Sequence, residues 1–550
     1  MNGSIKKIGL LIVLIVGISA TTVNNDKLYE ISKNIEIFVN VYKELNKNYV
    51  DDLDPSQLMR TGIDAMVKSL DPYTNYISES QVASYRISTD GKYQGIGAIV
   101  EKVGDYVTII EPYQNSPVVK AGLMAGDQIT AIQGRSTKGQ STEDMNQVVR
   151  GVPGTKVNLT IARKGQAPFD VELERSQVSI PNVPYSGYVS DGIGYVVLTT
   201  FTANATRNIR KAIKKMQDEN PDMRGLILDL RWNGGGLLKE AINISNIFVP
   251  QGKEVVSVRS KVSDRDVSYK TMGQPLDLEL PLVVMINKKS ASASEIVSGV
   301  IQDLDRGVIM GQRSYGKGLV QNTMEVGYNS RVKVTTSKYY IPSGRCIQSV
   351  RYEDGEPVDI PDAERAKFKT AGGRVVLDGG GVTPDVYIEN NGKAGILEQL
   401  DKQKIIFQYI NTIADKYKQD AEDADGEPIE PTEIKFTDYA GFAAFVKQSD
   451  FEFTSKNSEL IDQIKDNLKS DKQLGLMSEV EALEKRIDTE EASALEVHKE
   501  AIIADIEEKL ASRSHFQKGK YFQKLKNDSE IVQAIELLNN TGEYNKILEK

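Results

Sequence analysis

The segment from Phe169 to Glu389 constrains the fold most, because short apolar runs alternate in it with helical runs. The runs GIGYVVLTTF, GLILDLRW, LPLVVMIN and RGVIMGQ have the length and the Val/Ile/Leu content of buried strands. Between them, TRNIRKAIKKMQ, GLLKEAINISNIFV and ASEIVSGVIQDL place apolar residues at helical spacing. Alternation of this kind is typical of an α/β fold. The sequence therefore predicts an α/β core over residues 167–392.

Three further regions flank or interrupt this core. Residues 24–88 have helical patterns, and DPYTNYI is expected to close them as a turn. Residues 89–166 hold short strands and two helices, which predicts a compact inserted module. Residues 393–550 are charged and mostly helical in pattern. The expected fold class is thus α/β multidomain, with a helical N-terminal segment and a helical C-terminal extension.

The first twenty residues resemble a secretory signal peptide. Lys6 and Lys7 precede the thirteen-residue apolar run IGLLIVLIVGISA, and polar residues follow it. The run is shorter than the roughly 20 residues that span a bilayer, so cleavage is preferred, although an uncleaved tether through residues 8–20 stays open. No cysteine follows it, which excludes a lipoprotein anchor. We expect an exported protein of the periplasm or cell envelope, with the inner membrane as a second option.

Charge and cysteine content exclude several classes of function. The net charge of −9 argues against a general nucleic-acid binder, because phosphates need a basic surface. Cys346 is the single cysteine, so neither an internal disulfide nor a cysteine-based metal site can form. We expect no cofactor and no metal.

The stretch NKKSASASEI places Ser290, Ser292 and Ser294 between a predicted strand and a predicted helix. Unpaired N–H groups at a helix start favour an oxyanion, which suits a serine nucleophile. The alternative is that Ser290 or Ser292 only caps the helix, with support from Glu295. The two histidines of the chain lie in the charged tail, where we expect solvated side chains. A serine nucleophile here would need another base.

Two neighbouring motifs offer the missing parts. In GQRSYGKGLVQ, Lys317 lies between two glycines, and a desolvated lysine can replace histidine as a base. The alternative is an ordinary exposed loop lysine. In DLRWNGGGLL, a glycine turn could present a backbone N–H to a substrate carbonyl. That turn could instead hold phosphate, but it lacks the lysine and the spacing of nucleotide-binding loops.

These motifs, together with YYIPSGRCIQ and GGGVTPD, resemble those of the carboxyl-terminal processing peptidases, also called tail-specific proteases, over roughly residues 30–390. The resemblance implies a Ser–Lys dyad and an oxyanion hole built from backbone N–H groups. It departs at Trp232, where the family often has a small or polar residue, and at Cys346, where it usually has serine. The implied roles are nucleophile for Ser292, general base for Lys317, orientation of that lysine for Gln321, and oxyanion hole for Ala293 with Gly235 or Gly236.

Residues 89–166 resemble a PDZ domain, the usual companion of this peptidase core. The run YQGIGA is similar to the loop that receives a terminal carboxylate through successive N–H groups, and the bound peptide then adds a strand. The residues implied are Gly95, Ile96, Gly97 and Ala98. Arg150 could act as a sensor at the border of the module, although an exposed arginine at a helix end fits equally well.

The resemblance implies an exported serine endopeptidase that recognises protein C-termini through the PDZ module and cleaves the substrate. Its partners would be proteins or peptides with exposed C-termini, and the extension could serve oligomerisation or an adaptor. One alternative is a scaffold whose PDZ module recruits tails to an inactive core. Another is an α/β hydrolase, which needs a G-x-S-x-G turn that is absent around the serines.

Overall fold

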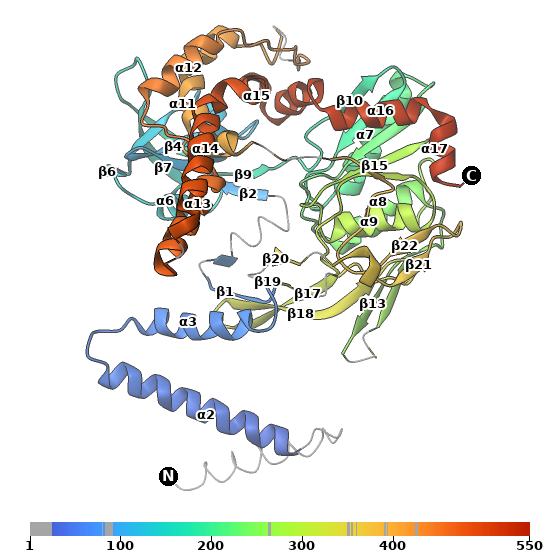
Figure 1. Ribbon diagram of the computed structural model, residues 1–550, viewed down its shortest axis with the longest axis horizontal. Coiled ribbons are helices and arrows are strands. Elements are labelled where there is room, and N and C mark those ends of the chain that lie inside the picture. Colours follow the sequence, from blue (N-terminus) through green and yellow to red (C-terminus); the bar gives the residue numbers. More distant parts are fainter. Residues whose placement is uncertain are drawn as a thin grey trace. The chain divides into compact units, whose positions relative to one another are not determined.

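The computed structural model describes residues 25–79, 81–82, 92–261, 264, 266–348, 352–353, 356–358, 360–389, 392, 394–423, 427–472 and 474–549 (Figure 1). The chain forms two compact units, Met1–Ser78 with Thr323–Thr335, and Glu79–Asn322 with Thr336–Lys550. The expected signal peptide, residues 1–20, lies outside the described residues.

The larger unit contains a six-stranded sheet in the order β10-β11-β12-β15-β16-β23. Strands β11 to β23 of this order run parallel, and β10 is antiparallel to β11. Every residue of β11, β12, β15 and β16 is buried, as continuous apolar runs in a parallel sheet require. The α/β core is therefore confirmed. Its strands are β10 (Ser186–Ser190), β11 (Ile193–Val197), β12 (Gly225–Asp229), β15 (Leu282–Ile286), β16 (Val308–Gly311) and β23 (Val386–Tyr387).

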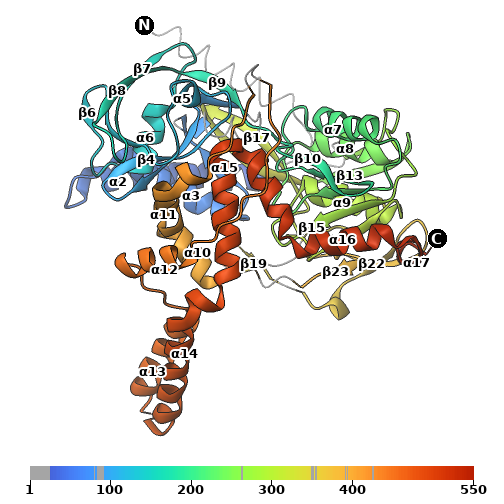
Figure 2. The same cartoon turned by 90° about the horizontal axis from the view of Figure 1, so that it is seen from above.

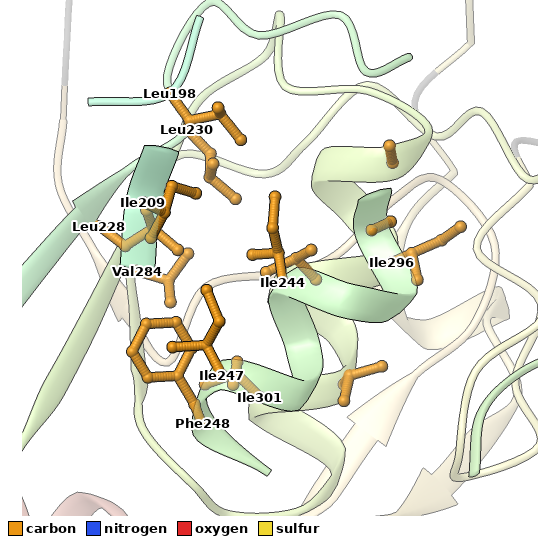
Figure 3. Close-up of a cluster of buried hydrophobic side chains, with 14 of the residues drawn as sticks. Leu198, Ile209, Leu228, Leu230, Ile244, Ile247, Phe248, Val284, Ile296 and Ile301 are labelled. Atoms are coloured by element: carbon orange, nitrogen blue, oxygen red, sulfur yellow. The ribbon is translucent and has the colours of Figure 1, made fainter. Parts of the chain in front are cut away.

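One face of this sheet packs against the three helices that connect its strands. These helices are α7 (Ala205–Glu219), α8 (Leu238–Phe248) and α9 (Ala293–Asp303). Alternate strand residues such as Leu228 and Val284 meet Ile244 of α8 and Ile296 of α9 in one buried cluster (Figure 3). Each such side chain contributes about 1.5–3 kcal/mol by leaving water, so this face anchors the strands and the start of α9 firmly.

The opposite face is covered by the end of the chain. Helices α16 (Ser529–Asn539) and α17 (Thr541–Ile547) lie on it (Figures 1 and 2). The intervening strand residues, among them Tyr195 and Ile227, form a second cluster with Leu537 and Tyr544. The last two helices of the charged extension are therefore part of the α/β core, because they form the layer that covers its second face.

A second, antiparallel sheet has the order β1-β18-β13-β14, with β17 beside β18. The sequence predicts a turn at DPYTNYI, and this is wrong in part, because Asn75–Ile77 forms β1 and pairs with β18. A three-residue strand has too short a residue pattern to be distinguished from a turn. Its pairing with β18, far along the chain, determines that it forms a strand. The strands are β13 (Glu254–Ser260), β14 (Val267–Lys270), β17 (Leu319–Gly327) and β18 (Ser330–Tyr340).

The smaller unit carries the expected N-terminal helices, α2 (Asn25–Asn48) and α3 (Pro55–Lys68). Asp54 caps α3 by accepting the N–H groups of Ser56 and Gln57, and Pro55 occupies the first turn, where it needs no N–H partner. The Tyr42 hydroxyl donates to the Pro55 carbonyl, 2.8 Å away, and ties the two helices together.

The inserted module is a β-sheet in the order β3-β4-β5-β7-β8, with β6 beside β5 and a separate β2–β9 pair. Strand β8 pairs with β7, so the sheet runs to Glu174, beyond the expected boundary at residue 166. The elements are β2 (Lys92–Gly95), β3 (Ala98–Val103), β4 (Tyr106–Pro112), α5 (Pro117–Lys120), β5 (Gln128–Ile132), β6 (Arg135–Ser136), α6 (Thr142–Val149), β7 (Lys156–Ala162), β8 (Phe169–Glu174) and β9 (Ser176–Ser179).

The extension begins with six helices, and all of them except α13 contribute to an apolar core of their own, centred on Tyr409, Phe442 and Ile506. No helix in the described part of the chain is long and apolar enough to span a bilayer. The six helices are α10 (Gly395–Lys402), α11 (Ile405–Ile413), α12 (Tyr439–Gln448), α13 (Lys456–Ser470), α14 (Met477–Val497) and α15 (Lys499–Lys526).

The contact of α17 with the sheet yields a stability prediction. The Tyr544 hydroxyl accepts from the Leu282 N–H at 2.9 Å and donates to the Leu282 carbonyl at 3.1 Å. Tyr544→Phe removes both hydrogen bonds and should lower the free energy of unfolding by about 1–3 kcal/mol. Tyr328, which is 98% exposed, offers the control. Tyr328→Phe should change stability by less than about 0.5 kcal/mol in the same urea titration, and equal urea midpoints for the two variants would contradict the prediction.

Candidate active site

The candidate residues gather where β12 and β15 end. These strands are adjacent and parallel, with Leu228 opposite Val284, so the loops that follow them emerge at the same edge of the sheet. This edge is where open α/β sheets bind ligands. The loop after β12 carries the glycine turn, and the loop after β15 carries the serines. Two motifs some sixty residues apart are thereby brought together.

The three serines have different surroundings. Ser290 and Ser294 are fully buried, and their hydroxyls donate to the Leu230 and Asn233 carbonyls at 2.8 and 2.9 Å. Both serve to hold the two loops together. Ser292 is only half-buried. Of the three hydroxyls, that of Ser292 is therefore the one open to a substrate.

The backbone of Ser292 is strained. It has φ 56° and ψ −111°, a region that a side chain with a Cβ rarely adopts. Its N–H donates to Glu295 Oε2 at 2.7 Å, while helix α9 begins at the next residue, Ala293. Glu295 thus supports the helix start, as the capping interpretation expects. The same contact holds the sharp turn that presents Ser292, so capping and catalysis are compatible.

Lys317 lies on a loop that the same carboxylate organises. Glu295 Oε2 also accepts the Lys317 N–H at 2.9 Å, and Oε1 accepts the Gly316 N–H at 2.7 Å and the Ser314 hydroxyl at 2.6 Å. One carboxylate oxygen therefore joins the backbones of Ser292 and Lys317. Lys317 itself is half-buried, not an ordinary exposed loop lysine.

A second group spans the same two residues. The Tyr339 hydroxyl, on β18, lies within hydrogen-bonding distance of the Ser292 carbonyl oxygen, at 3.2 Å, and of the Lys317 carbonyl oxygen. Tyr339 is 1% exposed. The turn at Ser290–Ser294 (the serine turn) and the loop at Ser314–Gly318 (the lysine loop) are thus fixed to each other twice. Glu295 joins them from helix α9, and Tyr339 joins them from strand β18.

The glycines beside Lys317 have separate steric reasons. Gly316 has φ +91°, where a side chain would be strained. Gly318 approaches Gln348 so closely that a Cβ would lie 2.7 Å from the Gln348 nitrogen. The Gly318 N–H donates to Gln348 Oε1 at 2.8 Å. Both glycines let the loop run tightly against its neighbours, which explains the G-K-G pattern.

The glycine turn is fastened to the serine turn by Asn233, which is fully buried. The Asn233 carbonyl accepts the Ala291 N–H at 3.0 Å, and its Oδ1 accepts the Gly235 N–H at 2.9 Å. Gly235 is buried, whereas Gly236 is exposed. A Cβ on Gly235 would lie 2.7 Å from the Ala291 carbonyl oxygen and 2.9 Å from the Ala293 nitrogen. The turn can approach the serines only because residue 235 has no side chain.

The sequence did not reveal the structural importance of several residues at this site. Glu295 was expected only to support a cap, and its spacing of three residues from Ser292 was the available signal. Asn233 and Tyr339 lie inside motifs, but their contacts cross the fold and leave no local pattern. Gln321 is the third residue of β17. Within the described ranges, no group of three or more His, Cys, Asp and Glu residues is arranged to hold a metal ion.

One expectation about the histidines is wrong. His515 was expected to be solvated, but it is only 6% exposed and lies in α15, where the backbone departs from helical geometry. Burial lowers the pKa of its imidazole. Its neighbours include Glu430 and the backbone of Asp420 and Ile429, which lie more than eighty residues earlier in the chain, so the local sequence around His515 does not reveal its burial.

The expected carboxylate loop of the inserted module is ordered and enclosed. Ile96 and Ala98 are 0% and 2% exposed, and a Cβ on Gly97 would lie 2.3 Å from the Ser116 Cβ. The Ile96 N–H donates to the Val149 carbonyl at 3.2 Å. That N–H is therefore engaged within the module in this state.

Arg150 lies directly beside the loop. It forms an isolated antiparallel bridge with Gly95, and its guanidinium carbon is 5.7 Å from the centre of the Tyr93 ring. The residue is half-buried. The structure thus brings Arg150 together with Gly95, rather than leaving it as an exposed arginine at a helix end.

A serine turn, a lysine loop and a glycine turn at one sheet edge define a serine-type peptidase class. Family models match residues 192–357 ("Peptidase family S41"), 94–173 ("PDZ domain") and 396–538 ("Probable PDZ-protease, C-terminal helical domain"). The carboxy-terminal-processing protease of Bartonella bacilliformis is 35% identical over 352 residues, which cover 64% of this chain and 80% of the relative. The chain belongs to peptidase family S41, the C-terminal processing proteases, and carries a PDZ domain.

Two further similarities were found. A "Probable CtpA-like serine protease" of Staphylococcus aureus (strain COL) is 30% identical over 357 residues, covering 64% of this chain and 71% of the relative. Among solved structures, the photosystem II D1 C-terminal processing protease is 27% identical and covers 64% of this chain and 92% of that one, with a TM-score of 0.35.

The close approach of Gly235 yields a prediction with a matched control. Gly235→Ala places a methyl group against the Ala291 carbonyl and should displace the glycine turn, whereas nothing lies within 4 Å of a Cβ on Gly234. We expect Gly235→Ala to lower kcat/KM by roughly 100-fold or more, the scale of losing an oxyanion donor. Gly234→Ala should keep near-wild-type activity. Equal activities of the two variants in a peptide cleavage assay would refute the steric argument.

Glu295 yields a prediction about pH. Burial raises the pKa of its carboxyl, although the Ser314 hydroxyl and backbone N–H groups hydrogen-bond to it and act in the opposite direction. The folded state thus binds this proton more tightly than the unfolded state does. The associated stabilisation is present at low pH and is lost as pH rises through the raised pKa.

Glu295→Gln removes this titration. Between about pH 4 and pH 8, the stability of the wild type should therefore fall relative to that of the variant as pH rises. Urea midpoints measured for both proteins across this range test the sign. A difference that is constant with pH, or that grows in favour of the wild type as pH rises, would contradict it.

Proposed function

We propose that this peptidase cleaves substrates with a Ser292–Lys317 dyad and that Ala293, with Gly235 or Gly236, stabilises the oxyanion. The observation that carries the proposal is the single oxygen of Glu295, which accepts the N–H groups of both Ser292 and Lys317 at 2.7 and 2.9 Å. No helix cap requires the second contact. Both residues are half-buried and their backbones share this oxygen, which supports the proposed dyad.

The proposed reaction proceeds through an acyl-enzyme. Neutral Lys317 accepts the Ser292 hydroxyl proton as Oγ attacks the substrate carbonyl carbon. The resulting oxyanion is held by the Ala293 N–H and an N–H of the glycine pair. The C–N bond then breaks, and Lys317 gives its proton to the leaving amine. Lys317 then deprotonates a water molecule that attacks the ester carbonyl, and as the C–O bond breaks it returns the proton to Ser292 Oγ.

Gln321 is proposed to orient the lysine. A lysine serves as a base only when its surroundings favour the neutral form, and partial burial acts in that direction. A neighbouring side-chain amide can accept a hydrogen bond from the amine and set its direction. Gln321 follows Lys317 by four residues, at the start of the strand β17 into which the lysine loop leads. This closeness in the chain supports the assignment.

The PDZ domain is proposed to select the substrate. Such domains bind peptide C-termini by adding a strand to a sheet edge. Here the loop Gly95–Ile96–Gly97–Ala98 would receive the carboxylate, with Arg150 as the neighbouring sensor. Binding raises the effective concentration of the tail at the peptidase core. Because the Ile96 N–H is engaged by Val149, we infer that carboxylate binding exchanges this contact for one with the substrate.

The protein is further proposed to act after export, in the periplasm or cell envelope. The support is the lysine-flanked apolar run at residues 8–20. The proposed reaction needs no cofactor.

Alanine substitutions test the dyad. Ser292→Ala and Lys317→Ala should each abolish cleavage of an unstructured protein, while Lys289→Ala, at the exposed position directly before the buried Ser290–Ala291 pair, should not. Full activity of either dyad variant would exclude the assigned chemistry. An inactive wild type would instead favour the scaffold alternative.

A paired substrate tests C-terminal recognition. One peptide is offered with a free C-terminal carboxylate and the other with an amide, and fragments are quantified by mass spectrometry. We expect the amidated peptide to be cleaved at least about tenfold more slowly, since the amide has no charge for the loop to bind. Equal rates would remove the role assigned to Gly95–Ala98.

A further inference from the structure

Arg231 is a buried cation at the base of the glycine turn. Its side chain is 6% exposed and contacts the carboxylates of Asp229, Asp528 and Glu530, whose side chains are 5%, 8% and 6% exposed. Asp229 ends β12, two residues before Arg231. Asp528 is the N-cap of α16 and Glu530 lies in its first turn, and both are about 300 residues from Arg231 along the chain. Buried charges are tolerated only when paired.

The geometry of the group is specific to arginine. Nε and Nη2 of Arg231 donate to Asp229 Oδ1 and Oδ2 at 3.0 and 2.7 Å. Nη1 and Nη2 donate to Asp528 Oδ1 and Oδ2 at 3.2 and 2.7 Å. The guanidinium thus forms two bidentate pairs at once, and Nη1 lies 3.1 Å from Glu530 Oε2. A lysine could not satisfy both carboxylates.

These contacts bear on the backbone of the glycine turn. Arg231 is followed by Trp232, whose φ of +65° is strained for so large a side chain, and then by Asn233. The Trp232 N–H donates to Asn287 Oδ1 at 3.0 Å. The segment is therefore held on one side by Arg231 and on the other by Asn233 and Asn287. Between these anchors the chain has no freedom to relax the strained residue.

We propose that Asp528, in the C-terminal extension, is a positioning residue for the peptidase reaction. It fixes the Arg231 side chain, and Arg231 fixes the path of the chain into Gly235 and Gly236. The extension would then contribute to catalysis without touching the substrate. This inference rests on the oxyanion role proposed for the glycine turn, and it assigns a function to helix α16 beyond covering the sheet.

Asp528 has a second task that a suitable variant leaves intact. It is the N-cap of α16, and its Oδ1 accepts the Glu530 and Ile531 N–H groups at 3.1 and 3.3 Å. Asparagine caps helices as well as aspartate does. Asp528→Asn therefore keeps the cap but removes the charge that pairs with Arg231. The matched control is Asp438→Asn, because Asp438 is also an N-cap of the extension, at α12, and accepts the Gly441 N–H.

The kinetic test compares these variants with the wild type on one peptide substrate. We expect Asp528→Asn to lower kcat by about tenfold or more, because the oxyanion donors are misplaced, while KM stays within about threefold. Asp438→Asn should match the wild type in both. Glu530→Gln removes the carboxylate charge that contacts Arg231 Nη1 and should lower kcat less than Asp528→Asn does. It provides a second variant if the thermal midpoint of Asp528→Asn is too low for the assay.

Fluorescence provides a readout that does not depend on activity. Trp232 is the single tryptophan of the chain, is 64% exposed and lies within the turn itself. In a Ser292→Ala background, adding Asp528→Asn should change the emission or iodide quenching of Trp232, and adding Asp438→Asn should not. Far-UV circular dichroism and the thermal midpoint confirm folding of each protein.

The outcomes separate the two proposals. A changed Trp232 signal with a lowered kcat supports the positioning role. Wild-type kcat and wild-type fluorescence in both Asp528→Asn and Glu530→Gln overturn it. If the wild type proves inactive, the proposed function fails, yet the fluorescence comparison still decides whether Asp528 controls the turn. A fall in kcat that accompanies loss of the folded state, with unchanged Trp232 fluorescence in the folded fraction, also counts against it.

Discussion

The site depends on one buried carboxylate. Glu295 accepts N–H groups from the serine turn and from the lysine loop, and without it four donors would lose their acceptor. Such a loss costs about 1–3 kcal/mol per buried group, so removing this carboxylate would weaken the connection between the two loops. Burial works against the charge of this group and raises its pKa. The converging donors are what make a carboxylate tolerable there, and that convergence fixes Ser292 relative to Lys317.

The sheet supplies the rest of the precision. Parallel strands β12 and β15 deliver their following loops to one edge, and the buried Asn233 ties the two loops together. Strain at Ser292 and Trp232 is maintained because each residue lies between anchors that are themselves buried. The cap of α9 and the turn that is proposed to present the nucleophile, Ser292, are therefore one structure.

Elements with a strong local pattern could be predicted from the sequence, and contacts between distant segments could not. The apolar runs of β11, β12, β15 and β16 determine an α/β core, because strands covered on both faces have no polar alternation. Spacing could not separate Ser292 from its neighbours, whereas burial does. The strand at Asn75–Ile77, the enclosure of His515 and the pairing of Arg231 with Asp528 all depend on partners far along the chain. No local rule contains that information.

The covering of the sheet by α16 and α17 has a consequence for biosynthesis. During translation, residues 192–317 leave the ribosome long before residues 529–548, so the apolar face around Tyr195 and Ile227 stays bare in the nascent chain. A polypeptide interrupted before α16 would leave this face uncovered and would lack the Asp528 partner of Arg231.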